Sequence, residues 1–284
     1  MTPSPCPPAT SLEIFRRMCL VRCFEQGVVR AVTRKDIKVA VYLSTGQESV
    51  AAAVSVTEAR GWLTFTQHRA HDIYLAFGGP PEALRDELLG RPGGTSGGRA
   101  GSNCIQYHAD GVEMFGHHGF IGENAPLAAG AALGSGRRTL CVFGDGAVEE
   151  DYVLATLGFA ATKRLPMLFL CIDNDLSILT PTADRRSWSA ARVAEAFGLA
   201  TAESSDDPWE LLAHVDDLSR RLPAFLNVKV CRGYWHVGVG VDGAPTWDRF
   251  SLVKQALADQ GLGADAARIE AETQSDMEAL WQAP

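Results

Sequence analysis

Two short polar segments near the middle of the chain have the spacing expected of a metal and phosphate site. Gly144-Asp145-Gly146 directly follows one apolar segment, and Asn174 directly follows another. Because parallel strands end at one edge of a sheet, both segments should project to the edge where ligands bind in open α/β folds. A helix that starts close to Asp145 would direct its N–H groups at a phosphate.

Asp145 and Asn174 also supply side-chain oxygens, which are the ligands that Mg²⁺ prefers. The residues alone therefore predict a magnesium-bridged diphosphate. The simpler alternative is that Asp145 is a turn residue, since Asp-Gly is common in turns. The placement of Asn174 at the end of the next apolar segment favours the metal site.

The elements that must position these residues form a βαβ unit. Thr139–Phe143 and Pro166–Ile172 are continuous apolar runs, and residues 149–163 between them have helical spacing. Strands without polar alternation are typical of a parallel sheet buried on both faces. The sequence predicts an α/β fold with a doubly wound, mainly parallel sheet and helices on both faces.

The rest of the chain fits the same architecture. Residues 1–10 are interpreted as a flexible lead-in and residues 11–284 as a single domain, with Ser11 as the N-cap of a long first helix. The small apolar segment 125–133 predicts a buried helix. Further helices are expected at residues 49–59, 81–89, 189–197, 209–222 and 251–280, and further strands at residues 62–66 and 225–230.

Composition excludes several classes of protein. The 284 residues carry a net charge of −8, which argues against nucleic-acid binding as the main role. No apolar run reaches about 18 residues, so no transmembrane helix is expected. The seven cysteines form no Cys-x-x-Cys pair, which predicts a reducing, cytoplasmic location without disulfides. His68 and His71 lack a third ligand for zinc.

Two pattern matches are discounted on their context. Gly94-Thr95-Ser96-Gly97-Gly98 fits the nucleophile elbow of hydrolases, but no strand precedes it. The segment 238–243 fits the dinucleotide fingerprint, but Ala244-Pro245 follows where a helix must begin. Both segments are expected to be loops.

Several motifs in order give the chain a family resemblance. The Gly-Asp-Gly motif followed after 29 residues by Asn174 is the thiamine diphosphate motif, and the chain resembles the α subunits of two-subunit, E1-type 2-oxo acid dehydrogenases, which include the pyruvate, branched-chain and acetoin enzymes. The resemblance covers about residues 11–240. Its other motifs are Met18-x3-Arg22-x-Phe24-Glu25, Gly46-Gln47-Glu48, Arg69-Ala70-His71, the glycine-rich loop 90–101, Gly119-x-Ile121-Gly122 and Arg232-x3-His236.

The resemblance implies a role for each matching residue. Asp145, Asn174 and the Leu176 carbonyl would hold Mg²⁺. The diphosphate would lie against the Gly144 turn, the N–H groups of Gly146 and Ala147, and the Arg69 guanidinium. Gly119 and Ile121 would contact the aminopyrimidine, with Ile121 bending the cofactor. His68 stands where the family has a diphosphate-binding tyrosine.

Two histidines are the candidate catalytic residues. His236 matches the histidine of the family's mobile loop, where it would contact the cofactor or substrate and transfer a proton. His71 and His236 could each instead be structural histidines, as could His118. For Arg69, a structural ion pair is the alternative to a phosphate contact.

The sequence also departs from the family pattern at several positions. Tyr42 replaces a substrate-facing histidine, Asp72 replaces a glycine, and Asp173 replaces the first asparagine of an Asn-Asn pair. The run 149–151 is unusually acidic for a segment beside a diphosphate.

The resemblance implies an α subunit that decarboxylates a 2-oxo acid and transfers the acyl or aldehyde unit, with thiamine diphosphate and Mg²⁺ as cofactors. In this family a β subunit supplies the activating glutamate, so an α₂β₂ heterotetramer is expected, with a lipoyl-bearing or other acyl acceptor. Two alternatives remain. The same architecture can serve as a decarboxylase, carboligase or acyltransferase of a specialised pathway, or the chain can be a non-catalytic cofactor-binding or regulatory subunit. No nucleic acid or membrane partner is expected.

Overall fold

The structure is a computed structural model that describes residues 6–116, 119–241 and 243–283. His118 therefore lies outside the described residues. Within those ranges, no helix is both long enough and apolar enough to cross a membrane.

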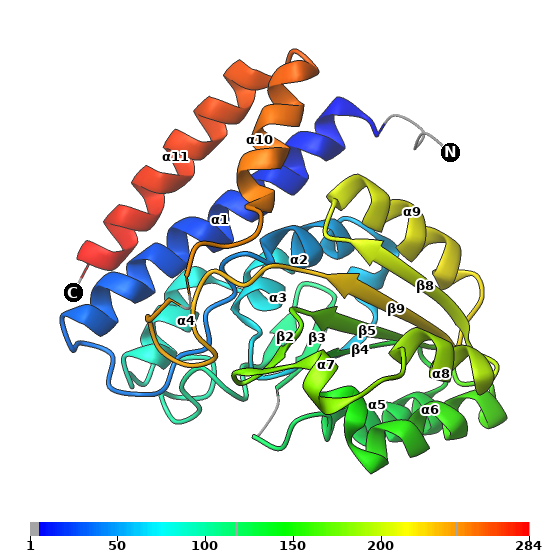
Figure 1. Cartoon of the computed structure of the whole chain (residues 1–284). Coiled ribbons are helices and arrows are strands. Elements are labelled where there is room, and N and C mark those ends of the chain that lie inside the picture. The colour runs from blue at the N-terminus through cyan, green and yellow to red at the C-terminus, as the bar shows by residue number, and fades with distance from the viewer. Residues whose placement is uncertain (1–5, 117–118, 242, 284) are drawn as a thin grey trace.

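A seven-stranded sheet forms the centre of the molecule (Figure 1). Its order is β2-β3-β1-β4-β5-β9-β8, and every neighbouring pair is parallel except β2 with β3. The strands are β1 (Leu63–Phe65), β2 (Tyr107–Ala109), β3 (Val112–Phe115), β4 (Thr139–Gly144), β5 (Met167–Asp173), β8 (Ala200–Ser205) and β9 (Ala224–Lys229). The predicted mainly parallel sheet is thus confirmed.

Helices cover both faces of the sheet (Figure 1). One face packs on α5 (Asn124–Ser135), α6 (Asp151–Lys163) and α8 (Ala190–Ala196). The other packs on α1 (Pro8–Thr33), α2 (Glu48–Ser55), α3 (His71–Ala76), α4 (Pro81–Leu88) and α9 (Pro208–Ser219). Alternate residues of β4 and β5 enter the two cores, which is why neither strand shows polar alternation.

A third layer lies outside α1. It consists of α10 (Arg249–Asp259) and α11 (Gly263–Gln282), and α11 runs along α1 (Figure 1). The Trp281 ring lies 5.3 Å from that of Phe24, and a Cβ atom at Gly27 would overlap the indole. A glycine of α1 therefore makes room for the largest side chain of α11.

Some predicted boundaries are wrong. The first helix begins at Pro8, because a proline at N1 is already in a helical conformation. Ser11 consequently lies inside the helix, and its hydroxyl accepts a hydrogen bond from the Trp209 indole at 2.9 Å. The expected helix 251–280 is two helices that separate at Gly261, whose φ is +79°. The edge strand β8 was not expected, because Ala-Thr-Ala-Glu-Ser-Ser carries little apolar signal.

Helix α5 is correctly placed but only partly buried. Leu127 and Leu133 are 52% and 54% exposed, although its alanines pack into the core. The segment is apolar on the outward side as well, so its composition does not reveal which face lies inside.

The glycine-rich loop wraps around one carboxylate. The side chain of Glu87, at the end of α4, accepts hydrogen bonds from the backbone N–H groups of residues 96, 98, 100 and 101 at 2.6–3.1 Å. These bonds counteract the burial of Glu87 and hold its pKa below the ordinary value. Gly94 lies against Glu87 with no room for a Cβ atom. The loop is thus a structural nest, and the discounted hydrolase pattern lies within it.

The other discounted pattern is also a loop. Gly238 donates its N–H to the Val41 carbonyl at 2.8 Å, and Gly240 accepts from the Trp235 N–H at 2.7 Å. The next helix, α10, begins only at Arg249. This loop instead brings His236 to the end of the sheet.

Candidate active site

The sheet has a switch point between β1 and β4. From β1 the sheet extends to β3, and from β4 it extends in the opposite direction to β5. The loops that leave these two strands diverge there and open a crevice at the carboxyl edge, as in other open α/β folds. Gln67 and His68 follow β1, and Asp145 follows β4.

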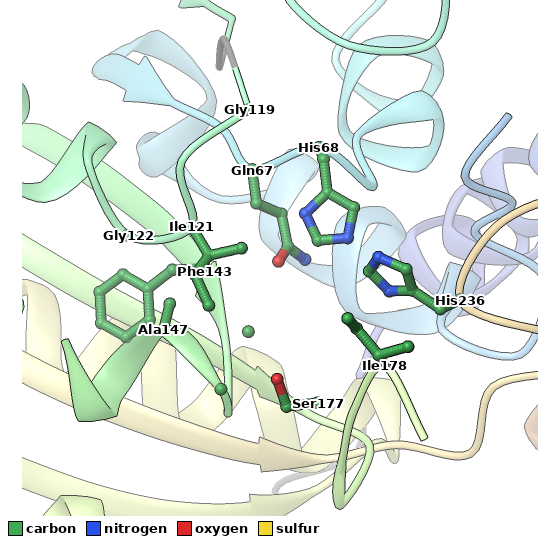
Figure 2. Close-up of a pocket in the computed structure, with 12 residues that line it drawn as sticks. Gln67, His68, Gly119, Ile121, Gly122, Phe143, Ala147, Ser177, Ile178 and His236 are labelled. Carbon is green, nitrogen blue, oxygen red and sulfur yellow. The ribbon is translucent and has the colours of Figure 1, made fainter. Parts of the chain in front are cut away.

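A cavity of about 240 Å³ occupies this crevice. The side chains of Gln67, Ile121, Ser177, Ile178 and His236 converge on it from separate loops (Figure 2). Among the described residues, the lining comes from positions that follow or end β1, β3, β4, β5 and β9, namely Gln67, His68, Gly119, Ile121, Gly122, Phe143, Gly144, Gly146, Ala147, Ser177, Ile178 and His236.

Six of the residues predicted as cofactor contacts thus line one cavity, together with His236. Three other lining residues, Gln67, Ser177 and Ile178, were not singled out from the sequence. Gln67 could have been predicted as a site residue from the sequence, because it lies just beyond a predicted strand. The other two lie in a short hairpin, β6 (Leu176–Ser177) with β7 (Thr180–Pro181), for which the sequence carries little signal.

Asp145 lies in the turn after β4 and is 1% exposed. Its Oδ2 accepts hydrogen bonds from Arg185 Nη2 at 2.5 Å and from the Thr182 hydroxyl at 3.4 Å. Burial raises the pKa of this carboxyl to about 6, with a further contribution from nearby Asp173, and Arg185 opposes the shift. The predicted metal ligand is therefore paired with a guanidinium in this structure.

The acidic run after the Gly-Asp-Gly motif also has cationic partners. Glu149 receives hydrogen bonds from Arg185 and from Arg186, the latter at 2.6 Å. Arg186 also donates to the backbone carbonyl of Asp145 at 2.7 Å. Glu149 belongs to a short 3-10 turn (Ala147–Glu149), so the helix α6 begins later than the sequence suggested. The negative charge of Glu149 is thus balanced by two arginines of the same chain.

Asn174 and Leu176 lie in the segment that follows β5, whereas Asp145 follows β4. Both line a neighbouring cavity of about 420 Å³, and Asn174 Oδ1 accepts the Leu176 N–H at 3.2 Å. Among the described residues, no three His, Cys, Asp or Glu side chains gather closely enough to hold a metal ion. The predicted magnesium donors are a carboxylate, an amide and a carbonyl oxygen, a set that suits a hard cation.

Arg69 is buried and contacts backbone oxygens. Its guanidinium donates to the carbonyl of Leu43 at 2.5 Å and to that of His236 at 3.1 Å. Burial, with the nearby Arg232 charge, lowers the pKa of Arg69 to about 10. In this arrangement Arg69 fixes the loop that carries His236, and it does not line the cavity.

Three aromatic rings pack together at one wall of the cavity. The ring centroids of His68 and His236 are 5.1 Å apart, and Tyr42 lies 4.8 Å from the first and 5.5 Å from the second. Burial, with the Arg69 and Arg232 charges, lowers the pKa of His236 to about 4. His236 is therefore neutral at physiological pH and can donate or accept a proton.

His71 is placed behind the cavity wall and is fully buried. Its Nδ1 lies 3.2 Å from Glu25 Oε1, and its Nε2 lies 2.8 Å from the Ser102 hydroxyl. The Ser102 oxygen also accepts the Tyr42 N–H at 3.0 Å. His71 does not line the cavity, so its geometry supports a positioning role for the Tyr42 segment and does not favour the direct catalytic role expected from the sequence.

Asp72 belongs to the same buried region. Its carboxylate accepts hydrogen bonds from the Ser44 hydroxyl at 3.1 Å, the Gln47 amide at 2.8 Å and the Ile73 N–H at 2.9 Å. Burial nevertheless raises its pKa to about 6. The folded protein therefore binds this proton more tightly than the unfolded chain, and this group's contribution to stability is lost as the pH rises from about 4 to about 6.

We expect Asp72→Asn to raise the free energy of unfolding at pH 7.5 by about 2 kcal/mol, because the amide carries no buried charge. Gln47 Oε1 is buried with no hydrogen-bond partner among the described residues, and it can accept the new N–H after an amide flip. Urea denaturation at pH 7.5 and pH 4.5 measures the effect. The gain should shrink at pH 4.5, and a less stable variant at pH 7.5 would refute the argument.

The fold places the chain in a known structural class. The fold of this chain resembles that of transketolase from Campylobacter jejuni with a TM-score of 0.60 over 96% of this chain and 48% of that one, at 14% identity. Transketolase from Leishmania mexicana gives a TM-score of 0.59 over 95% of this chain and 46% of that one, at 15% identity. At such identities the likeness concerns the fold alone.

The sequence comparisons define the family. Residues 16–209 match the model of the dehydrogenase E1 component, and the chain belongs to that family. The α subunit of acetoin:2,6-dichlorophenolindophenol oxidoreductase from Cupriavidus necator is 30% identical over 240 residues, covering 80% of this chain and 71% of that one. The mitochondrial pyruvate dehydrogenase E1 component subunit alpha-1 from Oryza sativa is 30% identical over 190 residues, covering 65% and 47%. The chain spans about half the length of most such relatives.

Proposed function

We propose that this chain is the α subunit of a thiamine diphosphate-dependent E1-type enzyme. It would decarboxylate a 2-oxo acid and pass on the acyl or aldehyde unit. The observation that carries the proposal is the cavity at the carboxyl edge, where the Gly-Asp-Gly turn, Ile121 and His236 meet in a chain of the dehydrogenase E1 family.

The residues present fit the cofactor. The backbone at Gly146 and Ala147 forms one wall of the cavity and would receive the diphosphate, with Mg²⁺ held by Asp145, Asn174 and the Leu176 carbonyl. Gly119 has a φ of +125°, and an added Cβ atom there would meet none of the described residues, so its backbone stays open to a ring. When bound, thiamine diphosphate supplies the electron sink for decarboxylation.

The protein's own contribution to the reaction comes from the aromatic wall. The neutral His236 imidazole faces the cavity and can move a proton to or from a bound substrate. His68 and Tyr42 pack against this imidazole and restrict its orientation. Ile121 and Phe143 exclude water from the opposite part of the lining.

One component of the expected chemistry comes from outside this chain. None of the described residues that line the cavity carries a carboxylate, whereas the family uses an activating glutamate. Glu48 is buried and engaged by Arg22 and by the Gly46 N–H, away from the cavity. We therefore propose a β subunit that brings the glutamate, in an α₂β₂ assembly.

The surface around the cavity supports such a partner. Large apolar side chains on the loops after β3, β5 and β9 are exposed, as are those on the outer face of α5. These side chains are Phe120, Ile178, Leu179, Trp235, Val237, Val241, Leu127 and Leu133. The residues on the three loops lie close in sequence to residues that line the cavity, and exposed apolar side chains of this kind are typical of a protein interface.

The test is reconstitution of the full chain with a separately purified β-like E1 chain from the same genome. We expect decarboxylation of at least one 2-oxo acid, with thiamine diphosphate and Mg²⁺ present, by the mixture and by neither chain alone. A set of straight, branched and hydroxylated 2-oxo acids covers the substrate class. A dye, a lipoyl domain and an aldehyde as acceptors separate dehydrogenase from carboligase chemistry.

Two outcomes would contradict the proposal. Steady turnover by this chain alone would show that it is a complete enzyme. A mixture that binds thiamine diphosphate but releases no CO₂ from any 2-oxo acid would favour the non-catalytic subunit.

A further inference from the structure

The Asp145 carboxylate has a cationic partner that the sequence motif did not reveal. Arg185 Nη2 lies 2.5 Å from Asp145 Oδ2, and the Arg185 side chain is 11% exposed. The same guanidinium also reaches Glu149 through Nη1. One arginine therefore bridges the proposed metal ligand and the unusual acid that follows it.

We infer that Arg185 is a tethered cation that holds Asp145 in the metal-free protein, so that Mg²⁺ and Arg185 exclude each other there. This inference rests on the proposed metal site. A divalent cation bound to Asp145 would lie within a few ångströms of a guanidinium, and like charges at that separation repel strongly in a buried site. Asp145 Oδ2 already accepts hydrogen bonds from the Arg185 guanidinium and the Thr182 hydroxyl, so a cation that binds this oxygen has to displace Arg185.

The segment that carries Arg185 can move. Arg185 is the last residue of α7 (Thr182–Arg185), a single turn in which no residue is buried. Arg185 Nε donates to the Thr180 carbonyl of the preceding hairpin at 3.2 Å, but the hairpin also has an anchor of its own, because Arg232 donates to the Ile178 carbonyl at 2.9 Å. Arg185 can therefore leave Asp145 while the proposed Leu176 ligand stays in place.

Glu149 gives the displaced arginine a second partner. Without metal, Asp145 and Glu149 face Arg185 and Arg186, so the charges of these four side chains balance. Mg²⁺ alone would leave this group with an excess of positive charge, and a diphosphate would neutralise it. Metal should therefore bind weakly alone and tightly together with diphosphate.

The experiment measures Mn²⁺ binding to the full-length chain by electron paramagnetic resonance of the free ion, with and without inorganic pyrophosphate. We expect Arg185→Gln to lower the Kd for Mn²⁺ alone by about tenfold, because a charge-assisted hydrogen bond no longer competes. Arg185→Lys keeps the charge and should retain the weak binding of the wild type. Arg192→Gln removes an exposed arginine of α8 and serves as the matched control.

Asp145→Asn separates this inference from the proposed function. If Asp145→Asn loses Mn²⁺ binding but Arg185→Gln binds Mn²⁺ no more tightly than the wild type, Asp145 is a metal ligand and Arg185 does not compete with the metal. Undiminished Mn²⁺ binding in Asp145→Asn would overturn the metal site itself. A gain shared by Arg185→Gln and Arg192→Gln, or by Arg185→Lys, would also contradict a specific role for Arg185.

Thermal unfolding gives an independent readout. Arg185→Gln removes a cation that pairs with the Asp145 and Glu149 carboxylates, so the Tm of the variant without metal should be lower than that of the wild type. Saturating Mg²⁺ should then raise its Tm more than it raises that of the wild type. Equal shifts in the two proteins would contradict the inference.

Discussion

Replacing Asp145 by alanine should lower the affinity for thiamine diphosphate in the presence of Mg²⁺ by about a hundredfold or more, since the cation would lose its only carboxylate ligand. The variant should also lose its response to Mg²⁺, because the carboxylate that would hold the cation is gone and Arg185 and Arg186 would be the cations left beside this turn. Isothermal titration calorimetry with and without Mg²⁺ measures both quantities.

Asp184→Ala is the matched control, because it removes an exposed carboxylate from the turn α7. It should bind the cofactor like the wild type. The assignment of Asp145 as the metal ligand fails if Asp145→Ala keeps a magnesium-dependent affinity close to that of the wild type.

His236→Ala should lower kcat by about a hundredfold in the reconstituted enzyme, which is the usual contribution of a positioned acid or base. Cofactor affinity should change little, because the ring packs on Tyr42 and His68 at one wall of the cavity while the Gly-Asp-Gly turn forms another. Steady-state rates at saturating cofactor, with cofactor affinity from calorimetry, separate the two effects.

The pH profile adds a second check on His236. Because the pKa of His236 is lowered to about 4, the imidazole stays neutral from about pH 5 upward. Hence kcat/KM should show no inflection from this residue near pH 6.5, and the loss caused by protonation of His236 should begin only as the pH approaches 4. His108→Ala, which removes an exposed histidine of β2, is the control. Equal kcat values for His236→Ala and the wild type would remove His236 from the mechanism.

The βαβ unit around Asp145 could be predicted because its strands are buried on both faces. Such strands are continuous apolar runs, and β4 and β5 agree with the predicted ranges to within one residue at each end. The edge strand β8 and the hairpin β6–β7 could not be predicted in the same way, because they lie at the margin of the fold and carry mixed side chains.

The sequence predicted the positions of site residues well where a motif fixes the backbone conformation. It predicted them less well where a long side chain has several possible contact partners. Gly119, Ile121, Gly146 and His236 reach one cavity as the motifs suggested. Arg69 had two plausible partners, a phosphate and a structural contact, and only the fold shows that it binds the Leu43 and His236 carbonyls. Nothing local in the sequence indicates which of these contacts forms.

The same reasoning applies to Arg185. It is separated from Asp145 by 40 residues, and the intervening chain forms α6, β5 and the hairpin. The excess of acid at residues 149–151 was visible in the sequence, and clustered acids, of which Glu149 and Glu150 are half-buried, favour a basic partner nearby. The sequence could therefore indicate that a basic partner exists, but its position depends on how the hairpin returns to the sheet.

The packing of α11 along α1 has a consequence for the order of folding. The Gly27 surface of α1 receives Trp281, which is synthesised more than 250 residues later. During synthesis on the ribosome, the apolar side of α1 that packs against α11 therefore stays exposed until most of the chain has been made. An emerging chain in this state is a natural client for a chaperone, and contacts of such long sequence separation slow folding.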